Sequence, residues 1–157
     1  MIRLLLLLTL IISVEAEDPP PSRETAMVYM QRLLVETKDH GLPTLLSQVV
    51  YREDQTVSPD LRTSVTEWIE AEQRRGWTTK AIAEHGDDDA KMLVMQHGQV
   101  IDPLFVVWVK KESSWKVVWQ TEDEYHFIGR ERVDRLRQQF QDIEEKFRAD
   151  RKKEPKR

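Results

Sequence analysis

The sequence predicts an α+β fold in which N-terminal helices pack on a curved antiparallel sheet, followed by a C-terminal amphipathic helix. Apolar residues recur at helical spacing between residues 23 and 76. The period changes to the alternation typical of strands between residues 80 and 120, and a helical period returns from about Gly129. Separate runs of helices and strands are typical of α+β domains rather than of alternating parallel-sheet folds.

The strongest strand signal is the stretch 104–120, which reads LFVVWVKKESSWKVVWQ. Two runs rich in β-branched and aromatic residues flank a short polar loop at 110–114, which predicts a β-hairpin. The run 104–109 is apolar throughout, so this strand should be covered on both faces. The returning strand alternates and should be half-buried, with Trp115, Val117 and Trp119 on one face and Lys116 and Gln120 on the other.

A first helix is expected to begin at Ser22, which is the predicted N-cap. Glu24 would then lie in the first turn, and Gly41 would close the helix. The apolar face of this helix comprises Ala26, Met27, Met30, Leu33 and Leu34.

Two more helices are expected before the strands. The apolar face of the second, shorter helix comprises Leu45, Leu46, Val49 and Val50. The third should begin at Ser58 and Pro59, an N-cap followed by proline at the first helical position, and end at Gly76. The residues at helical spacing along it are Leu61, Val65, Trp68, Ile69 and Glu72.

Another hairpin should precede the central one, with strands at 80–85 and 91–97. The loop between them contains three adjacent aspartates, Asp87–Asp89, which lack the longer ligand spacing of a calcium loop. We therefore expect a solvated loop. Gly98 and the pair Asp102–Pro103 should break the chain before the central hairpin begins.

The last helix carries a narrow apolar seam with steps of three and four residues: Val133, Leu136, Phe140, Ile143 and Phe147. In a parallel dimer the flanking positions would place Arg132 against Arg137 and Lys146 against Arg151, and both pairs are repulsive. We therefore predict that the seam docks on its own domain or on a larger partner surface, and that no parallel coiled-coil dimer forms.

The beginning of the chain has the pattern of a signal peptide, with a basic start, a short apolar segment and small residues at Val14 and Ala16. An uncleaved anchor is the alternative. The expected organisation is a signal peptide at 1–16, a proline-rich spacer at 17–22, a cone-like α+β domain at 23–127, an amphipathic helix at 128–150 and a basic tail at 151–157. Cleavage after Ala16 would leave no stable membrane anchor, so the predicted location is secreted or periplasmic.

Composition argues against several function classes. The chain has no cysteine, so packing alone must stabilise it. The formal charge of −4, with acids and bases mixed along the sequence, argues against nucleic-acid binding. The four histidines are scattered without zinc-site spacing, so we predict no metal ligands. We also expect no cofactor, because the sequence has no P-loop and no glycine-rich dinucleotide turn.

The five tryptophans give the strongest functional signal. Large aromatic residues usually pack in a core, but one or two of these could line a ligand cavity. The candidate pocket-lining residues are Tyr29, Trp68, Trp77, His97 and Trp108. Tyr29, Tyr51 and Asp102 are further candidates that could meet in a pocket for acid–base chemistry.

The order of elements resembles the nuclear-transport-factor-two-like superfamily. Within it the chain is similar to the exported lumazine-binding-like and polyketide-cyclase-like branches. The resemblance covers about residues 23–120 and rests on the helix ETAMVYMQRLLVETKDHGLPTLLSQVV, the strand pair AIAEHGDDDAKMLVMQHG and the motif SSWKVVW. It implies a cone of helices against a curved sheet, with a pocket between them. No catalytic position of the superfamily is carried over to a residue of this chain.

These observations lead us to expect an exported, non-catalytic domain that binds a small apolar ligand or a protein partner in or around the pocket. A small isomerase- or cyclase-like enzyme with a buried Asp, His or Tyr is the first alternative. A structural association module is the second. An enzyme needs such a group facing an open cavity near a second polar group, whereas a solid apolar core would favour the association module.

Overall fold

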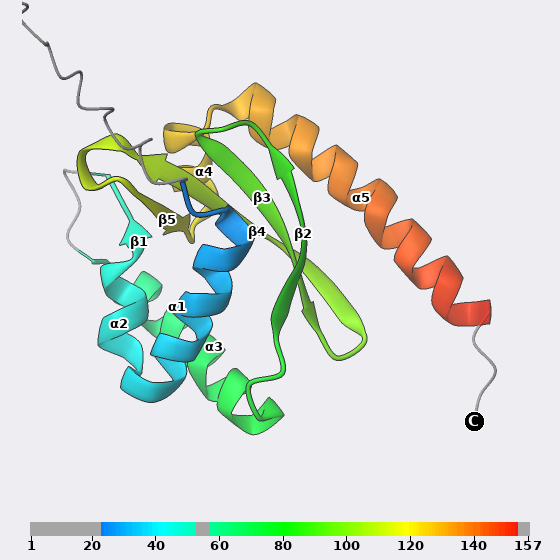
Figure 1. The fold of residues 1–157 in the computed structure, drawn as a ribbon, viewed down its shortest axis with the longest axis horizontal. Coiled ribbons are helices and arrows are strands. Elements are labelled where there is room, and N and C mark those ends of the chain that lie inside the picture. The colour runs from blue at the N-terminus through cyan, green and yellow to red at the C-terminus, as the bar shows by residue number, and fades with distance from the viewer. Residues whose placement is uncertain (1–22, 53–56, 154–157) are drawn as a thin grey trace, which may run out of the picture.

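The computed structural model describes residues 23–52 and 57–153, and it confirms the α+β fold class (Figure 1). The expected signal peptide and spacer lie outside the described residues. The elements in chain order are α1 (Ala26–His40), α2 (Leu42–Ser47), β1 (Val49–Val50), α3 (Pro59–Arg75), β2 (Lys80–Gly86), β3 (Ala90–His97), β4 (Val100–Val109), the 3-10 turn η1 (Lys110–Glu112), β5 (Ser114–Val118), α4 (Thr121–Phe127) and α5 (Arg130–Lys153).

The five strands form one sheet in the order β1-β5-β4-β3-β2. The strands β2 to β5 are antiparallel to their neighbours, as expected, but β1 pairs with β5 in parallel. The prediction that Val49 and Val50 continue a helix was therefore wrong. The backbone N–H of Val117 donates to the Gln48 carbonyl at 2.8 Å, which directs the chain along β5, and the branched side chains of the two valines suit a strand.

The strand β4 begins earlier than expected. Its pairing with β3 runs from Val100 to Val107 without a break at Asp102 or Pro103. The pairing with β5 begins only at Phe105, so β4 has a single neighbour where the proline lies. An edge position of this kind tolerates proline, because a missing backbone donor need not interrupt a ladder.

The prediction that β5 is half-buried was also wrong, because both of its faces are covered. Trp115 and Val117 belong to the core beneath the N-terminal helices, and Val118 belongs to the core beneath α5. Lys116 is only 8% exposed. Its Nζ contacts Glu112 Oε2 at 2.7 Å and Gln48 Oε1 at 3.3 Å, which provides polar partners for a buried charge.

The first helix begins three residues later than predicted. Thr25 is the N-cap, since its hydroxyl accepts a hydrogen bond from the Val28 N–H at 3.2 Å, and Glu24 therefore precedes the helix. A second amide at this end that has no partner within the helix, that of Met27, donates to Glu84 Oε2 on β2 at 3.0 Å. A carboxylate from the sheet thus satisfies the start of α1 and fixes its position.

The predicted start and end of the third helix are confirmed. Ser58 accepts a hydrogen bond from the Leu61 N–H at 3.0 Å, and Gly76 ends the helix in the left-handed conformation with a φ of 73°. Leu61, Val65 and Ile69 are buried as expected. Glu72 is fully buried on the same face.

The seam of α5 docks on its own sheet, where Val133, Leu136 and Phe140 are buried and Ile143 and Phe147 are partly buried. The absence of a parallel coiled-coil dimer stays a prediction. The sequence did not predict α4, which turns the chain from β5 towards α5. The aspartate loop is also more than a solvated turn, because Arg132 on α5 pairs with both Asp87 and Asp89 at 2.8 Å.

The sheet separates two hydrophobic clusters. The helix-side core combines residues of α1, α2 and α3 with side chains from one face of the sheet, including Leu93, Val106 and Trp115. The α5-side core combines the opposite face, including Met92 and Phe105, with the seam of α5. Figure 1 shows this arrangement, with α1 to α3 on one side and α5 crossing the other.

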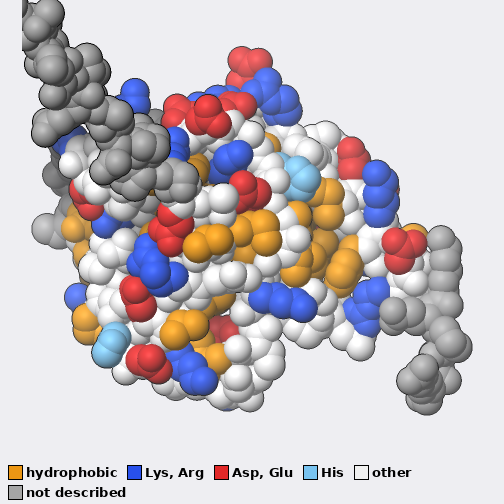
Figure 2. Space-filling view, in the orientation of Figure 1, with side chains coloured by type: hydrophobic (Ala, Val, Ile, Leu, Met, Phe, Trp, Pro, Cys, Tyr) orange, Lys and Arg blue, Asp and Glu red, His pale blue; other side chains and the backbone are white. Residues whose placement is uncertain are grey.

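Charged side chains of both signs are interspersed over the face drawn in Figure 2, and hydrophobic side chains gather on it between β2 and α5. A surface with mixed charges supports solubility rather than binding to a polyanion. None of the helices within 23–52 and 57–153 has both the length and the apolar character needed to span a bilayer.

Candidate functional site

A cavity of about 180 Å³, here called the inner cavity, lies between the N-terminal helices and the sheet. The side chains that line it come from α1, α3, the residue before β2, the end of β3, the first half of β4 and the residue after β5. They are Met30, Trp68, Thr79, Met95, His97, Asp102, Pro103, Leu104 and Trp119. Six of these nine are apolar or aromatic, which is the usual lining of a small-molecule site.

Tryptophan rings form one wall of the inner cavity. Trp68 on α3 stands edge-on to Trp119, with ring centroids 5.8 Å apart and planes at 85°. The Trp119 Nε1–H donates to Ser64 Oγ at 3.0 Å, which fixes the ring against α3. Edge-to-face pairs are a favoured aromatic geometry, so this wall is held in place before any ligand binds.

His97 and Asp102 form most of the polar part of the lining, and Thr79 is the third polar residue. The pairing of Met95 with Asp102 places His97 two residues along the same face of the sheet, within diagonal reach. His97 Nε2 lies 2.6 Å from Asp102 Oδ2. The His97 side chain is 17% exposed and that of Asp102 is 58% exposed, so the pair lies where the cavity meets solvent.

The second ring nitrogen of His97 has a different environment. Nδ1 is buried and has no hydrogen-bond partner among the described residues. Because the carboxylate of Asp102 accepts from Nε2–H, a neutral ring leaves Nδ1 as an acceptor. A mostly apolar cavity therefore has, in His97, an acceptor without a protein partner that could orient a ligand.

The structure brings together two of the five predicted pocket residues, Trp68 and His97, in the inner cavity. Trp77 lies next to Trp68, with ring centroids 6.3 Å apart, but does not line this cavity. Trp108 packs elsewhere, edge-on to Trp115 at 5.5 Å and beneath the guanidinium of Arg23.

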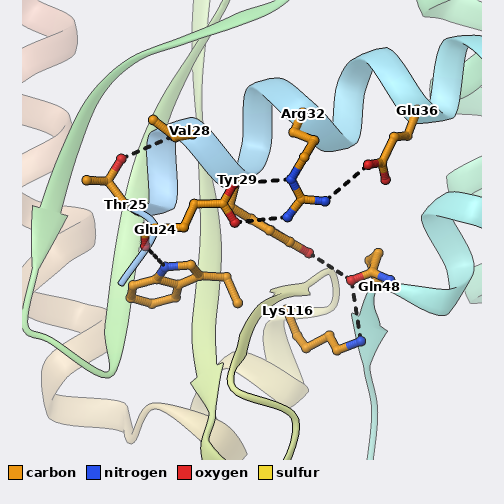
Figure 3. A network of polar contacts seen from close by, with 9 residues as sticks. Glu24, Thr25, Val28, Tyr29, Arg32, Glu36, Gln48 and Lys116 are labelled. Carbon is orange, nitrogen blue, oxygen red and sulfur yellow. Dashed lines mark hydrogen bonds and ion pairs between the residues drawn. The ribbon is translucent and has the colours of Figure 1, made fainter. Parts of the chain in front are cut away.

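Tyr29, the fifth predicted residue, belongs to a polar network away from the inner cavity. Figure 3 shows its hydroxyl pointing towards Gln48, whose Oε1 lies 3.5 Å away and also contacts Lys116 Nζ. Burial raises the pKa of Tyr29 well above its ordinary value. In the same view, Arg32 joins Glu24 and Glu36 along the outside of α1.

The proposed meeting of Tyr29, Tyr51 and Asp102 does not occur. Tyr51 follows β1 rather than lying on a helix, and its side chain is exposed. Only Asp102 of the three lines the inner cavity. This part of the acid–base hypothesis is therefore wrong.

A comparison with protein-family models, with curated proteins and with solved structures found no match. Membership of the nuclear-transport-factor-two-like superfamily therefore stays a prediction based on the sequence motifs. Within 23–52 and 57–153, no group of three or more His, Asp or Glu is placed to hold a metal ion.

Sequence reasoning missed several residues of the inner cavity, among them Thr79, Met95 and Leu104. The alternation of side chains along a strand could have identified two of them, because Met95 shares a face with His97, and Leu104 shares one with Asp102. Thr79 had no such signal. It became part of the site because its hydroxyl donates to Glu72 Oε1 at 2.6 Å, a carboxylate that also pairs with Arg75.

Proposed function

We propose that this chain is an exported, non-catalytic domain whose inner cavity binds a small apolar ligand of about the size of one aromatic ring. The observation that carries the proposal is an apolar cavity between helices and sheet, walled by Trp68 and Trp119. A packed core alone would leave few voids larger than a water molecule. The cavity thus argues against a purely structural association module.

The size of the cavity limits the ligand. An engineered apolar cavity of about 150 Å³ binds benzene, whereas sites for drug-sized molecules span roughly 300–1,000 Å³. At about 180 Å³ the inner cavity suits one ring. The free acceptor on His97 favours a ring that bears a hydroxyl group, such as phenol.

Calorimetric titration with phenol tests this function. We expect saturable binding to the wild-type protein and an affinity about tenfold lower in Leu104→Trp, because the larger side chain fills the cavity and about 1.4 kcal/mol corresponds to a factor of ten. Ile82→Trp on β2 is the matched control, since Ile82 is 37% exposed and does not line the cavity. Wild-type affinity in Leu104→Trp, or no saturable binding at all, would refute the function.

A second candidate is a small isomerase, favoured by the contact between His97 and Asp102 at the cavity. A histidine oriented by a carboxylate can accept a proton from a substrate and return it to another carbon. A one-ring β,γ-unsaturated ketone is a suitable probe, because its conversion to the conjugated isomer changes ultraviolet absorbance. Turnover that His97→Asn removes while phenol still binds would support the enzyme over the binding domain.

A further inference from the structure

A second concavity, here called the outer groove, runs along the outside of the structure beside the inner cavity. It has a volume of about 270 Å³ and lies between α1 and the start of β2. Its lining residues are Gln31, Leu34, Val35, Lys38, Trp77, Thr79 and Lys80. Val35 is 60% exposed, so the groove is open to solvent and apolar along part of its length.

Three observations show that the outer groove adjoins the inner cavity. Thr79 lines both. Met30 of the inner cavity and Leu34 of the outer groove are one helical turn apart on α1, a spacing that makes them neighbours. The rings of Trp68 and Trp77, one from each space, lie 6.3 Å apart.

Trp77 has an unusual backbone at this junction. Its φ is 58°, in the left-handed region that non-glycine residues rarely adopt. Its N–H donates to the Glu72 carbonyl at 2.9 Å, so the conformation is fixed by the end of α3. Strained residues of this kind concentrate at ligand sites. Trp77 therefore presents a large aromatic ring to the outer groove at a backbone position where a small turn residue is usual.

The outer groove is positively charged, although the chain as a whole is acidic. Lys38 and Lys80 line it, and no carboxylate residue does. The side chain of neither lysine has an ion-pair or hydrogen-bond partner in the part of the chain that the structure describes. The two ammonium groups are therefore available to an anion, whereas most other basic side chains near the sheet already pair with acids.

We propose that the two spaces form one elongated site for a medium-chain carboxylate, with its apolar chain in the inner cavity and its carboxylate between Lys38 and Lys80. This rests on the proposed function of the inner cavity and names its ligand class. The inner cavity accommodates about six carbons, by comparison with the benzene-binding cavity. The remaining carbons of a chain of about ten would extend past Thr79, which lines both spaces, into the outer groove.

Binding of decanoate and decanol, each below its micelle-forming concentration, tests the proposal. We expect decanoate to bind more tightly than decanol to the wild-type protein. Lys38→Gln combined with Lys80→Gln should weaken decanoate about fivefold and leave decanol unchanged, because two exposed ion pairs contribute about 1 kcal/mol in total. Lys110→Gln combined with Lys111→Gln is the matched control, since both lysines lie on η1 outside the groove.

The outcomes separate this proposal from the function on which it rests. Saturable phenol binding together with equal affinities for decanoate and decanol would overturn the carboxylate site and keep the inner cavity. An equal loss of decanoate affinity in both double variants would overturn it too, because it would show a general charge effect. A failure of phenol, decanol and decanoate to bind would overturn both proposals.

Discussion

The two faces of the sheet are covered in different ways. We expect the α5 side to contribute mainly to stability and the helix side to provide the binding site. A single long helix covers the α5-side core, and its seam inserts buried Val133, Leu136 and Phe140. Three shorter helices cover the other face and leave the inner cavity between themselves and the strands. Protein interiors have few voids larger than a water molecule, so a cavity of this size marks the helix side as the less closely packed one.

The polar contacts of the two sides do not divide in the same way. On the α5 side, Arg132 pairs with Asp87 and Asp89, and Arg137 pairs with Glu124 on α4, so the helix is tied to neighbouring elements. Buried atoms without hydrogen-bond partners among the described residues occur on both sides, at His97 Nδ1 and Glu72 Oε2 on the helix side and at Arg137 Nε on α5. Because an unsatisfied buried group is costly, the closeness of packing rather than the satisfaction of polar groups distinguishes the two sides.

The largest expected effect is on the α5 side. Phe140→Ala should lower the free energy of unfolding by about 3 kcal/mol, because it removes a buried aromatic ring from a closed core. Phe147→Ala, which removes a partly buried ring near the end of α5, should cost less than half as much. Denaturant titration measures both. A tight wild-type dimer in sedimentation, split by Phe140→Ala into stable monomers, would show that the seam serves association instead.

Two tryptophans on the helix side sharpen the comparison. Trp108→Ala should lower the free energy of unfolding by about 2 kcal/mol, less than for a fully buried ring, and leave phenol affinity unchanged. Trp119→Ala should also destabilise the fold, but it should weaken phenol binding because Trp119 lines the inner cavity. Parallel titrations of denaturant and phenol separate the roles. Equal binding losses in the two variants would contradict the assignment of one ring to the core and the other to the cavity.

The smallest effect concerns pH. The hydrogen bond from Arg132 lowers the pKa of Asp89, so their pairing stabilises the fold above the ordinary aspartate pKa and is lost as pH falls through the lowered value. Arg132→Gln should therefore cost less than about 1 kcal/mol at pH 7, since the Asp89 side chain is 60% exposed. Denaturant titrations at several pH values should show the difference shrinking below about pH 4. A constant difference would exclude this electrostatic origin.

The sequence predicted the elements with strong local signals. The cap at Ser58, the stop at Gly76 and the apolar run before Val109 all depend on neighbouring residues, so they could be read without tertiary contacts. The start of α1 could not, because Ser22 and Thr25 are both good caps. The fold uses Thr25, and the helix start at this cap is accompanied by a hydrogen bond from the Met27 amide to Glu84, which is distant in sequence. The strand at Val49 also depends on a partner more than sixty residues away.

The site was less predictable than the fold, because it also depends on contacts between residues that are distant in sequence. Aromatic residues suit both cores and cavities, so composition could not tell Trp68, which lines the inner cavity, from Trp108, which does not. The contact between His97 and Asp102 depends on the register of β3 against β4. The sequence analysis expected a break in the strand at Asp102, so it did not predict the contact between these two side chains.

The tryptophan side chains provide the most direct test of where a ligand binds, since each indole N–H gives its own resonance in a nitrogen-15 spectrum. Titration with phenol should shift the signals of Trp68 and Trp119 in a saturable manner. The signals of Trp108 and Trp115 should stay in place, although these rings lie in the same core. Saturable shifts confined to Trp108 and Trp115, or no saturable shift of any indole, would contradict a binding site in the inner cavity.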